Sequence, residues 1–126
     1  MWDMNCAIIK NHNDVVAPDD DVYILGDVML GDNEEGIKLI KELKGNLHII
    51  RGNHDTDVRI ELYKNCWNVV EVCDAKFLKF KKIMFYMTHF PSICANFGEE
   101  NKLSRCIVNL CGHSHTKEFL EDWNNR

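Results

Sequence analysis

The sequence has no long apolar run. Its longest apolar stretches are short segments such as Ile83 to Met87 and Ile107 to Cys111, whereas a membrane-spanning helix needs about 20 apolar residues. The N-terminus also lacks a basic segment followed by an apolar one, so no secretory signal is readable. We therefore expect no membrane partner and a cytoplasmic location.

The sequence also has little positive charge. Lysine and arginine together number 15 against 20 aspartates and glutamates, the formal net charge is -5, and there is no long basic run. A protein that coats nucleic acid needs the opposite balance. We therefore do not expect nucleic acid as a partner, and the acidic balance counts against a nuclease.

Paired cysteines are missing as well. The chain has six cysteines but no C-x-x-C pair, which argues against a structural zinc site made of cysteine pairs. Several of the cysteines lie in apolar runs, where a free cysteine behaves as a small buried hydrophobic residue. We expect the cysteines to be reduced.

What is present fits one folded domain. The chain has 126 residues, of which 45% are hydrophobic and 28% are charged, and this composition is close to the average for soluble globular domains. The length leaves little room for a second domain. No internal repeat or low-complexity tract interrupts residues 1–126.

Short apolar runs alternate with segments of helical spacing. The spacing of apolar residues predicts helices over residues 1–16, 33–43 and 56–64. Compact apolar runs predict strands over residues 22–25, 47–50, 77–80, 83–87 and 107–111, with a hairpin or tight connection at Lys81-Lys82. This alternation predicts an α/β architecture.

Polar side chains follow four of these predicted strands, and ligands gather at the carboxyl ends of strands in α/β sheets. The residues are Asp27, Asn53-His54-Asp55, His89 and His113-Ser114-His115. Carboxylate, amide and imidazole groups gathered at one edge of a sheet form a mixed ligand set that suits manganese, iron, zinc or related metals. Glycines at positions 26, 52 and 112 would let the backbone turn sharply after each strand.

The four motifs, in this order, resemble those of the calcineurin-like metallophosphoesterase family, and most closely its small, stand-alone bacterial or phage members. They are Gly26-Asp27, Gly52-Asn53-His54-Asp55, Thr88-His89 and Gly112-His113-Ser114-His115. The resemblance implies a β-sandwich flanked by helices, formed here by a single partial domain over residues 1–126. It also implies hydrolysis of a phosphomonoester or phosphodiester substrate at a di-metal centre.

The resemblance also assigns metal ligands. Asp27 would bridge two divalent metal ions, Asn53, His89 and His113 would complete the second metal site, and His115 would belong to the first. Manganese is the expected metal, with iron, zinc or nickel as alternatives.

Catalytic and substrate-binding roles follow from the same resemblance. His54 corresponds to the catalytic histidine that contacts the phosphate and protonates the leaving oxygen, and Asp55 would orient it. An adjacent histidine and aspartate at a strand end also make chemical sense as an acid and its orienting carboxylate. Asn53 and His54 would contact the substrate, and Arg51 is either a phosphate contact or an ordinary surface charge.

The sequence departs from the family at its start. The family begins with a strand ending in Asp-x-His, which supplies ligands to the first metal, and no such motif precedes Gly26-Asp27. His12 and Asp14 are present, but in reversed order on a predicted helix. We expect the domain to be truncated at both ends, with the second metal site complete and the first incomplete.

Two functions are therefore open from the sequence. One is a working phosphoesterase, and the other is a catalytically impaired, metal-binding remnant that acts as a binding or assembly module. A missing central strand would expose backbone edges and apolar surface, so a homo-oligomer is an expected form of either.

Overall fold

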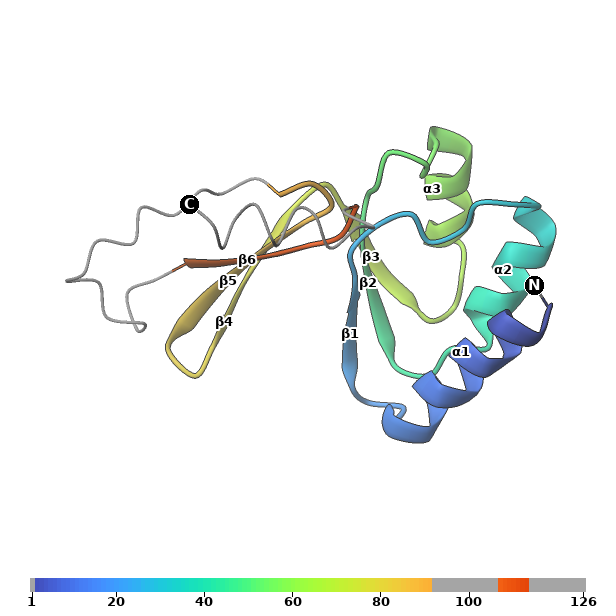
Figure 1. Cartoon of the computed structure of the whole chain (residues 1–126), viewed down its shortest axis with the longest axis horizontal. Coiled ribbons are helices and arrows are strands. Elements are labelled where there is room, and N and C mark those ends of the chain that lie inside the picture. The colour runs from blue at the N-terminus through green and yellow to red at the C-terminus, as the bar shows by residue number, and fades with distance from the viewer. Residues whose placement is uncertain (1, 92–106, 114–126) are drawn as a thin grey trace, which may run out of the picture.

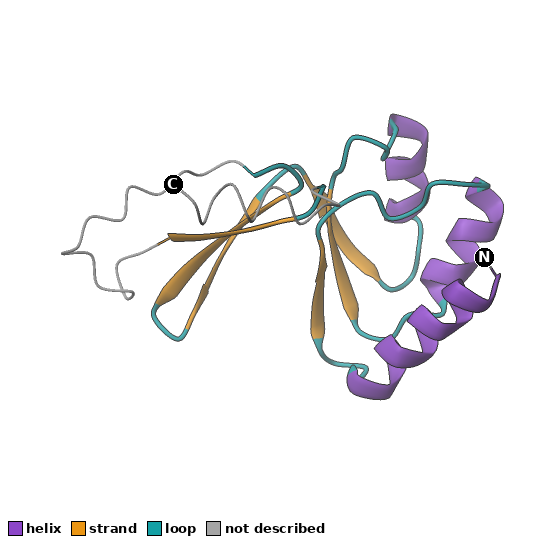
Figure 2. Cartoon of the chain, viewed as in Figure 1, coloured by secondary structure: helices purple, strands orange, loops and turns teal. Residues whose placement is uncertain are grey.

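The computed structural model describes residues 2–91 and 107–113. Within these ranges the chain forms three helices and two separate sheets of three strands each (Figures 1 and 2). The helices are α1 (Trp2–Val15), α2 (Asn33–Lys41) and α3 (Asp57–Lys64). The strands are β1 (Asp21–Ile24), β2 (Asn46–Ile50), β3 (Val69–Cys73), β4 (Lys76–Phe80), β5 (Ile83–Thr88) and β6 (Ile107–Cys111).

The first sheet is fully parallel, in the order β1-β2-β3. The central strand, β2, has the sequence expected of a strand covered on its faces, and Leu47, Ile49 and Ile50 are completely buried. Leu47 and Ile49 pack with Ile40 of α2 and Tyr63 of α3 in the main core. All three helices lie on the same side of this sheet (Figure 1).

The second sheet has the order β4-β5-β6. β4 and β5 form an antiparallel hairpin, and both residues of its turn, Lys81 and Lys82, have positive φ angles of 48° and 70°, as a two-residue type I′ turn requires. β5 and β6 are parallel. Because parallel strands end on the same side, β5 and β6 deliver the residues that follow them to one place.

The predicted α/β class is confirmed, and each predicted helix and strand is present with ends shifted by at most a few residues. The sequence analysis missed one element, β3, whose apolar run is interrupted by Glu71. It also placed the polar strand ends at one sheet edge, whereas the strands belong to two sheets. Among the described residues no helix is both long and apolar enough to cross a membrane, and Cys6, Cys66, Cys73 and Cys111 are free thiols.

α1 is attached mainly by its C-terminal end. His12 Nε2 lies 2.8 Å from the Lys44 carbonyl oxygen, and the Asn13 amide donates to the Glu42 carbonyl at 2.9 Å. The apolar residues that predicted this helix are largely uncovered, since Met4 is 57% and Ile8 is 56% exposed. They line an apolar groove between α1 and α2 that extends to Asp27.

A polar cluster crosses the parallel sheet on three strands. His48 of β2 lies 2.9 Å from Asp21 Oδ1 of β1 and 2.5 Å from Glu71 Oε2 of β3, and its ring stacks on Tyr23 with centroids 4.6 Å apart. Lys76 Nζ donates to the same Glu71 oxygen. These partners compensate the charge of Glu71 in β3. The same charge interrupts the apolar run of β3, which is why the sequence analysis did not predict this strand.

The Glu71 cluster should make folding stability depend on pH. The hydrogen bond from Lys76 is the main cause that holds the pKa of Glu71 below its ordinary value of 4.5, burial opposes it, and His48 adds to the lowering. Since the unfolded chain takes up this proton at a higher pH than the folded chain, the stability is present above about pH 4.5 and is lost as the pH falls through the folded pKa. We expect urea midpoints to drop more steeply below about pH 5 in the native protein than in Glu71→Gln.

The exposed Glu61 of α3, which pairs with Lys64 at 3.4 Å, provides the control. Glu61→Gln should leave the acid dependence close to that of the native protein, because exposed pairs contribute little. Equal acid slopes in the native protein and Glu71→Gln would contradict the assignment.

Candidate metal centre

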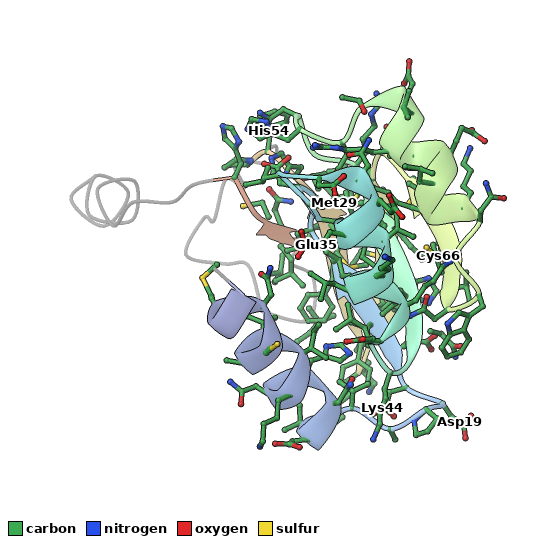
Figure 3. All side chains as sticks on the ribbon, turned by 90° about the vertical axis from the view of Figure 1, so that its right-hand side faces the viewer. Asp19, Met29, Glu35, Lys44, His54 and Cys66 are labelled. Atoms are coloured by element: carbon green, nitrogen blue, oxygen red, sulfur yellow. The ribbon has the colours of Figure 1, made fainter. Side chains whose placement is uncertain are left out.

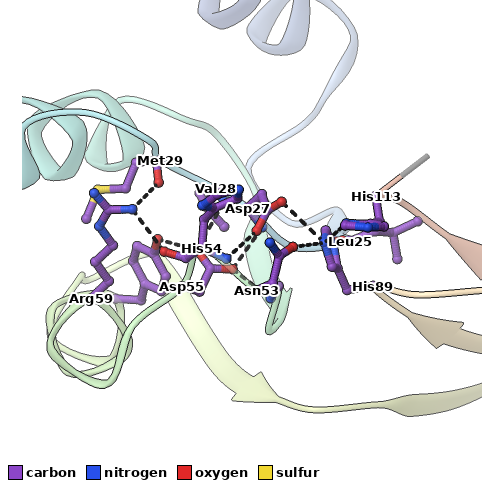
Figure 4. A network of polar contacts seen from close by, with 12 residues as sticks. Leu25, Asp27, Val28, Met29, Asn53, His54, Asp55, Arg59, His89 and His113 are labelled. Carbon is purple, nitrogen blue, oxygen red and sulfur yellow. Dashed lines mark hydrogen bonds and ion pairs between the residues drawn. The ribbon is translucent and has the colours of Figure 1, made fainter. Parts of the chain in front are cut away.

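Four of the five residues predicted as metal ligands come together where the two sheets meet. Asp27 follows β1, Asn53 follows β2, His89 follows β5 and His113 follows β6, and Figure 4 shows their side chains converging. The place lies at the end of the parallel sheet that carries His54, opposite the end that carries Lys44 (Figure 3). The fifth residue, His115, lies outside the described residues.

His89 is the centre of this group. Its side chain is 2% exposed, and its Nε2 lies 2.8 Å from Asn53 Oδ1, 3.2 Å from Asp27 Oδ2 and 3.2 Å from His113 Nδ1. The ligand atoms of Asp27, His89 and His113 all lie within 4.8 Å of one another. A single ion between them could contact all of these atoms after small side-chain movements.

The other ring nitrogen of His89 fixes the chemistry of Nε2. His89 Nδ1 lies 2.7 Å from the Leu25 carbonyl oxygen, which only accepts hydrogen bonds, so Nδ1 carries the hydrogen. In a neutral ring Nε2 then has a lone pair, which faces Asp27 Oδ2, Asn53 Oδ1 and His113 Nδ1. That lone pair can bind a cation placed among these groups. A backbone carbonyl on the far nitrogen is one of the usual orienting contacts of metal-binding histidines.

The Phe90 ring contacts the rings of both His89 and His113. Its ring centroid lies 4.9 Å from that of His89, in an edge-on arrangement, and 4.6 Å from that of His113. The two histidine rings are themselves 5.0 Å apart and inclined by 71°. The aromatic contact restricts the orientation of both imidazoles, which favours a fixed arrangement of their nitrogens.

Two candidate ligands hold unusual backbone conformations. Asp27 has a φ of 53° and His113 a φ of 66°, in the left-handed region that residues other than glycine seldom adopt. Such conformations persist only where the surroundings enforce them, and they gather at functional sites. At Asp27 the enforcing contact is a 2.8 Å hydrogen bond from its own N–H to Asp55 Oδ2.

The structure corrects the role predicted for Asp55. The carboxylate is 1% exposed and accepts four hydrogen bonds. Its Oδ2 accepts from the N–H groups of Asp27 and Gly52, both at 2.8 Å, and its Oδ1 from Val28 N–H at 3.2 Å and the Tyr63 hydroxyl at 2.7 Å. All its lone pairs are thereby engaged, so it does not orient the His54 ring. Asp55 instead joins the end of β2 to the loop that carries Asp27.

Glycines allow this close approach of two backbones. A Cβ atom on Gly26, whose φ is 94°, would lie 2.8 Å from the Gly52 Cα, and a Cβ on Gly52 would collide with Asp27. Gly26 therefore meets both a conformational and a steric need. Gly52 has no positive φ, so the sharp turn that the sequence analysis ascribed to it is not the reason for a glycine. A glycine is required there because a side chain would collide with Asp27.

His54 and Arg51 are placed differently from each other. His54 is exposed, its N–H donates to Asp27 Oδ1 at 2.8 Å, and its imidazole makes no hydrogen bond to any described residue. Arg51 donates from Nε to the Asp55 carbonyl at 3.0 Å and from Nη2 to Asp57 Oδ1 at 2.7 Å. The Arg51 guanidinium is thus engaged in the turn after β2, which fits the alternative of a structural surface charge.

Sequence reasoning missed two residues of α3 that support the site. Tyr63 donates to Asp55, and Arg59 donates to main-chain carbonyls of Met29, Gly31 and His54. The two residues are four apart and so share a helix face. Arg59 follows Asp55 by four residues and Tyr63 follows it by eight, and this helical spacing is the sequence signal that could have indicated that both face the start of α3.

Tyr63 provides a test of the Asp55 contacts. Burial, reinforced by the hydrogen bond to Asp55, raises the pKa of the Tyr63 phenol far above its usual range, so the hydroxyl remains a donor at all ordinary pH values. Tyr63→Phe should cost about 1 to 3 kcal/mol in the free energy of unfolding, because it deprives a buried carboxylate of a donor. It should also weaken binding of the manganese that the sequence analysis expects at this group, since Asp27 loses part of its support. Chemical denaturation and metal titration would measure both effects.

Val58→Ala is the matched change, because Val58 is on the same helix and 65% exposed. It should leave both quantities nearly unchanged. A Tyr63→Phe protein with native stability would show that the hydroxyl contributes nothing to the buried carboxylate.

Comparisons with known proteins bear on the fold alone. The chain matches no established family profile. A segment of 55 residues is 46% identical to an uncharacterized protein of Methanocaldococcus jannaschii, and the match covers 42% of this chain and 31% of that protein. A solved structure, a protein of unknown function from Aquifex aeolicus, has a TM-score of 0.58 and 28% identity over 76% of this chain and 50% of its own. The chain therefore spans half or less of these proteins, and it shares with the second a common arrangement of α/β elements.

Proposed function

We propose that this chain belongs to a metal-dependent hydrolase of phosphoester bonds, built on the calcineurin-like β-sandwich. The observation that carries the proposal is the environment of His89 Nε2. That atom is buried among Asp27 Oδ2, Asn53 Oδ1 and His113 Nδ1, while Nδ1 is held by the Leu25 carbonyl. Four strand ends from two sheets converge on this one atom, which supports a site built to hold a cation.

The ligand chemistry supports a first-row divalent metal. One carboxylate, one amide oxygen and two imidazoles form a mixed set of oxygen and nitrogen ligands, which suits manganese, iron, zinc or nickel better than calcium. We propose manganese as the metal. When bound, such an ion would polarise a phosphoryl oxygen and make a water molecule acidic enough to attack phosphorus at neutral pH.

The remaining steps fall to residues of the chain. The exposed His54 lies directly after the ligand Asn53, and its main chain is tied to Asp27 Oδ1. Its imidazole makes no hydrogen bond within the described part of the chain, so it is available to contact a phosphoryl group and to protonate the departing oxygen. Asn53, the ligand that directly precedes His54, would contact both the metal and the substrate.

The same metal group would also suit a catalytically impaired module. Asp27 has a second carboxylate oxygen, Oδ1, but His54 N–H already donates to it, and no second cluster of metal-binding side chains is found among the described residues. The presence of one metal therefore does not distinguish a hydrolase from a binding module. Turnover and the number of metals bound per chain do.

The proposal predicts different outcomes for two histidine variants. The native protein, loaded with manganese, should hold metal and hydrolyse bis(p-nitrophenyl) phosphate or p-nitrophenyl phosphate. His54→Ala should keep the metal and lose about a hundredfold or more in turnover, because only the proton donor is removed. His89→Ala should lose both metal and turnover. Metal content per chain by mass spectrometry and release of p-nitrophenol would be measured on the same samples.

His12→Ala is the control, because His12 lies on α1 and its Nε2 is engaged with the Lys44 carbonyl; it should change neither quantity. A native protein that binds no manganese, iron, zinc or nickel would refute the metal site. Metal binding without turnover on either substrate would identify the non-catalytic module.

A further inference from the structure

Arg59 of α3 joins two loops that run beside the metal group. Its Nε donates to Asn33 Oδ1 at 2.8 Å, and Nη1 donates to the carbonyls of Met29 at 2.7 Å and His54 at 2.9 Å. Its Nη2 donates to the Gly31 carbonyl at 3.0 Å. Figure 4 shows the guanidinium reaching from the helix toward Met29 and His54.

Three of these acceptors are main-chain carbonyls in segments without regular secondary structure. Met29 and Gly31 lie in the loop between β1 and α2, and His54 lies in the turn between β2 and α3. These three carbonyl groups are not part of the hydrogen-bond pattern of a regular helix or sheet, so their hydrogen bonds must come from other donors. One planar guanidinium, with five donors in fixed directions, supplies three of them at once.

The charge of Arg59 alone would not do this. A lysine ammonium is a compact charge on a flexible stem, whereas the arginine fork holds several acceptors in one plane. The Arg59 acceptors are neutral carbonyl and amide oxygens, so the contact fixes geometry more than it balances charge. The arrangement therefore ties the backbone of His54 to the loop that follows Asp27.

Asp55 and Arg59 act on different parts of these loops. Asp55 binds the N–H groups of Asp27 and Val28, next to the metal group. Arg59 binds the carbonyls of Met29, Gly31 and His54, beyond the metal group. Loss of Arg59 should therefore displace His54 while Asp27 stays in place.

We propose that Arg59 is a positioning residue for His54, because it ties the His54 main chain to the loop at residues 29–31, directly after Asp27 and Val28. This inference rests on the proposed function. Because a misplacement of about 1 Å can lower a catalytic rate by about a hundredfold, the residue should affect turnover without touching substrate.

The test compares Arg59→Ala and Arg59→Lys with Lys64→Ala, which removes an exposed cation from the same helix. Arg59→Lys keeps the charge and most of the stem, so it serves where the alanine variant fails to fold. With manganese and p-nitrophenyl esters, both Arg59 variants should lower kcat by about ten- to a hundredfold and leave KM and manganese content near native values, whereas Lys64→Ala should match the native protein. Added methylguanidinium should restore part of the activity of Arg59→Ala.

Amide exchange makes the inference independent of turnover. The N–H of His54 donates to Asp27 Oδ1 at 2.8 Å and that of Asp55 to the Gly52 carbonyl at 3.2 Å. In folded Arg59 variants both amides should exchange at least about tenfold faster than in the native protein and in Lys64→Ala.

The outcomes separate the two proposals. Native kcat in the Arg59 variants, or lost manganese binding in them, would overturn the role of Arg59 and leave the hydrolase intact. No turnover in the native protein would overturn the hydrolase, and the exchange rates would then decide whether Arg59 holds His54. Unchanged exchange rates would overturn the positioning role in either case.

Discussion

The geometry of the candidate site depends on one buried carboxylate. Asp55 is 1% exposed, and a buried charge of this kind is tolerated only when hydrogen bonds replace its hydration. Its four donors come from the loop after β1, from the turn after β2 and from Tyr63 of α3. Since bonds from N–H and O–H groups to a charged acceptor are stronger than those to a neutral one, the carboxylate fixes three segments relative to one another.

That constraint explains the unusual features around it. Asp27 is held at a positive φ by its N–H bond to Asp55, and the contact requires Gly26 and Gly52 to approach without side chains between them. Arg59 continues the same pattern further along the loops, where it binds carbonyls rather than N–H groups. Asp27 and His54 are thus positioned chiefly through their backbone, by α3 and by the turn after β2.

Much of the fold could be predicted from the sequence because its signals are local. Apolar runs at residues 47–50 and 107–111 mark strands, and polar residues after them mark the strand ends that meet at the site. β3 escaped prediction because Glu71 breaks its apolar run, and what makes a charge tolerable there is His48 on β2 and Lys76 on β4. Similarly, the apolar spacing of α1 predicted the helix but not its exposed face, with Met4 and Ile8 uncovered.

The sequence by itself determined the types of the candidate ligands and the strand ends on which Asp27, Asn53, His89 and His113 lie, because each depends on neighbouring residues. Only the tertiary structure decided that these ends belong to two sheets, that Asp55 supports the backbone rather than His54, and that Gly52 is there for space. The contacts responsible join residues distant in sequence, such as Asp27 with Asp55 and Asn53 with His89. A local sequence pattern does not indicate which distant donor will hydrogen-bond to a given acceptor, because the packing of the whole chain brings the two together.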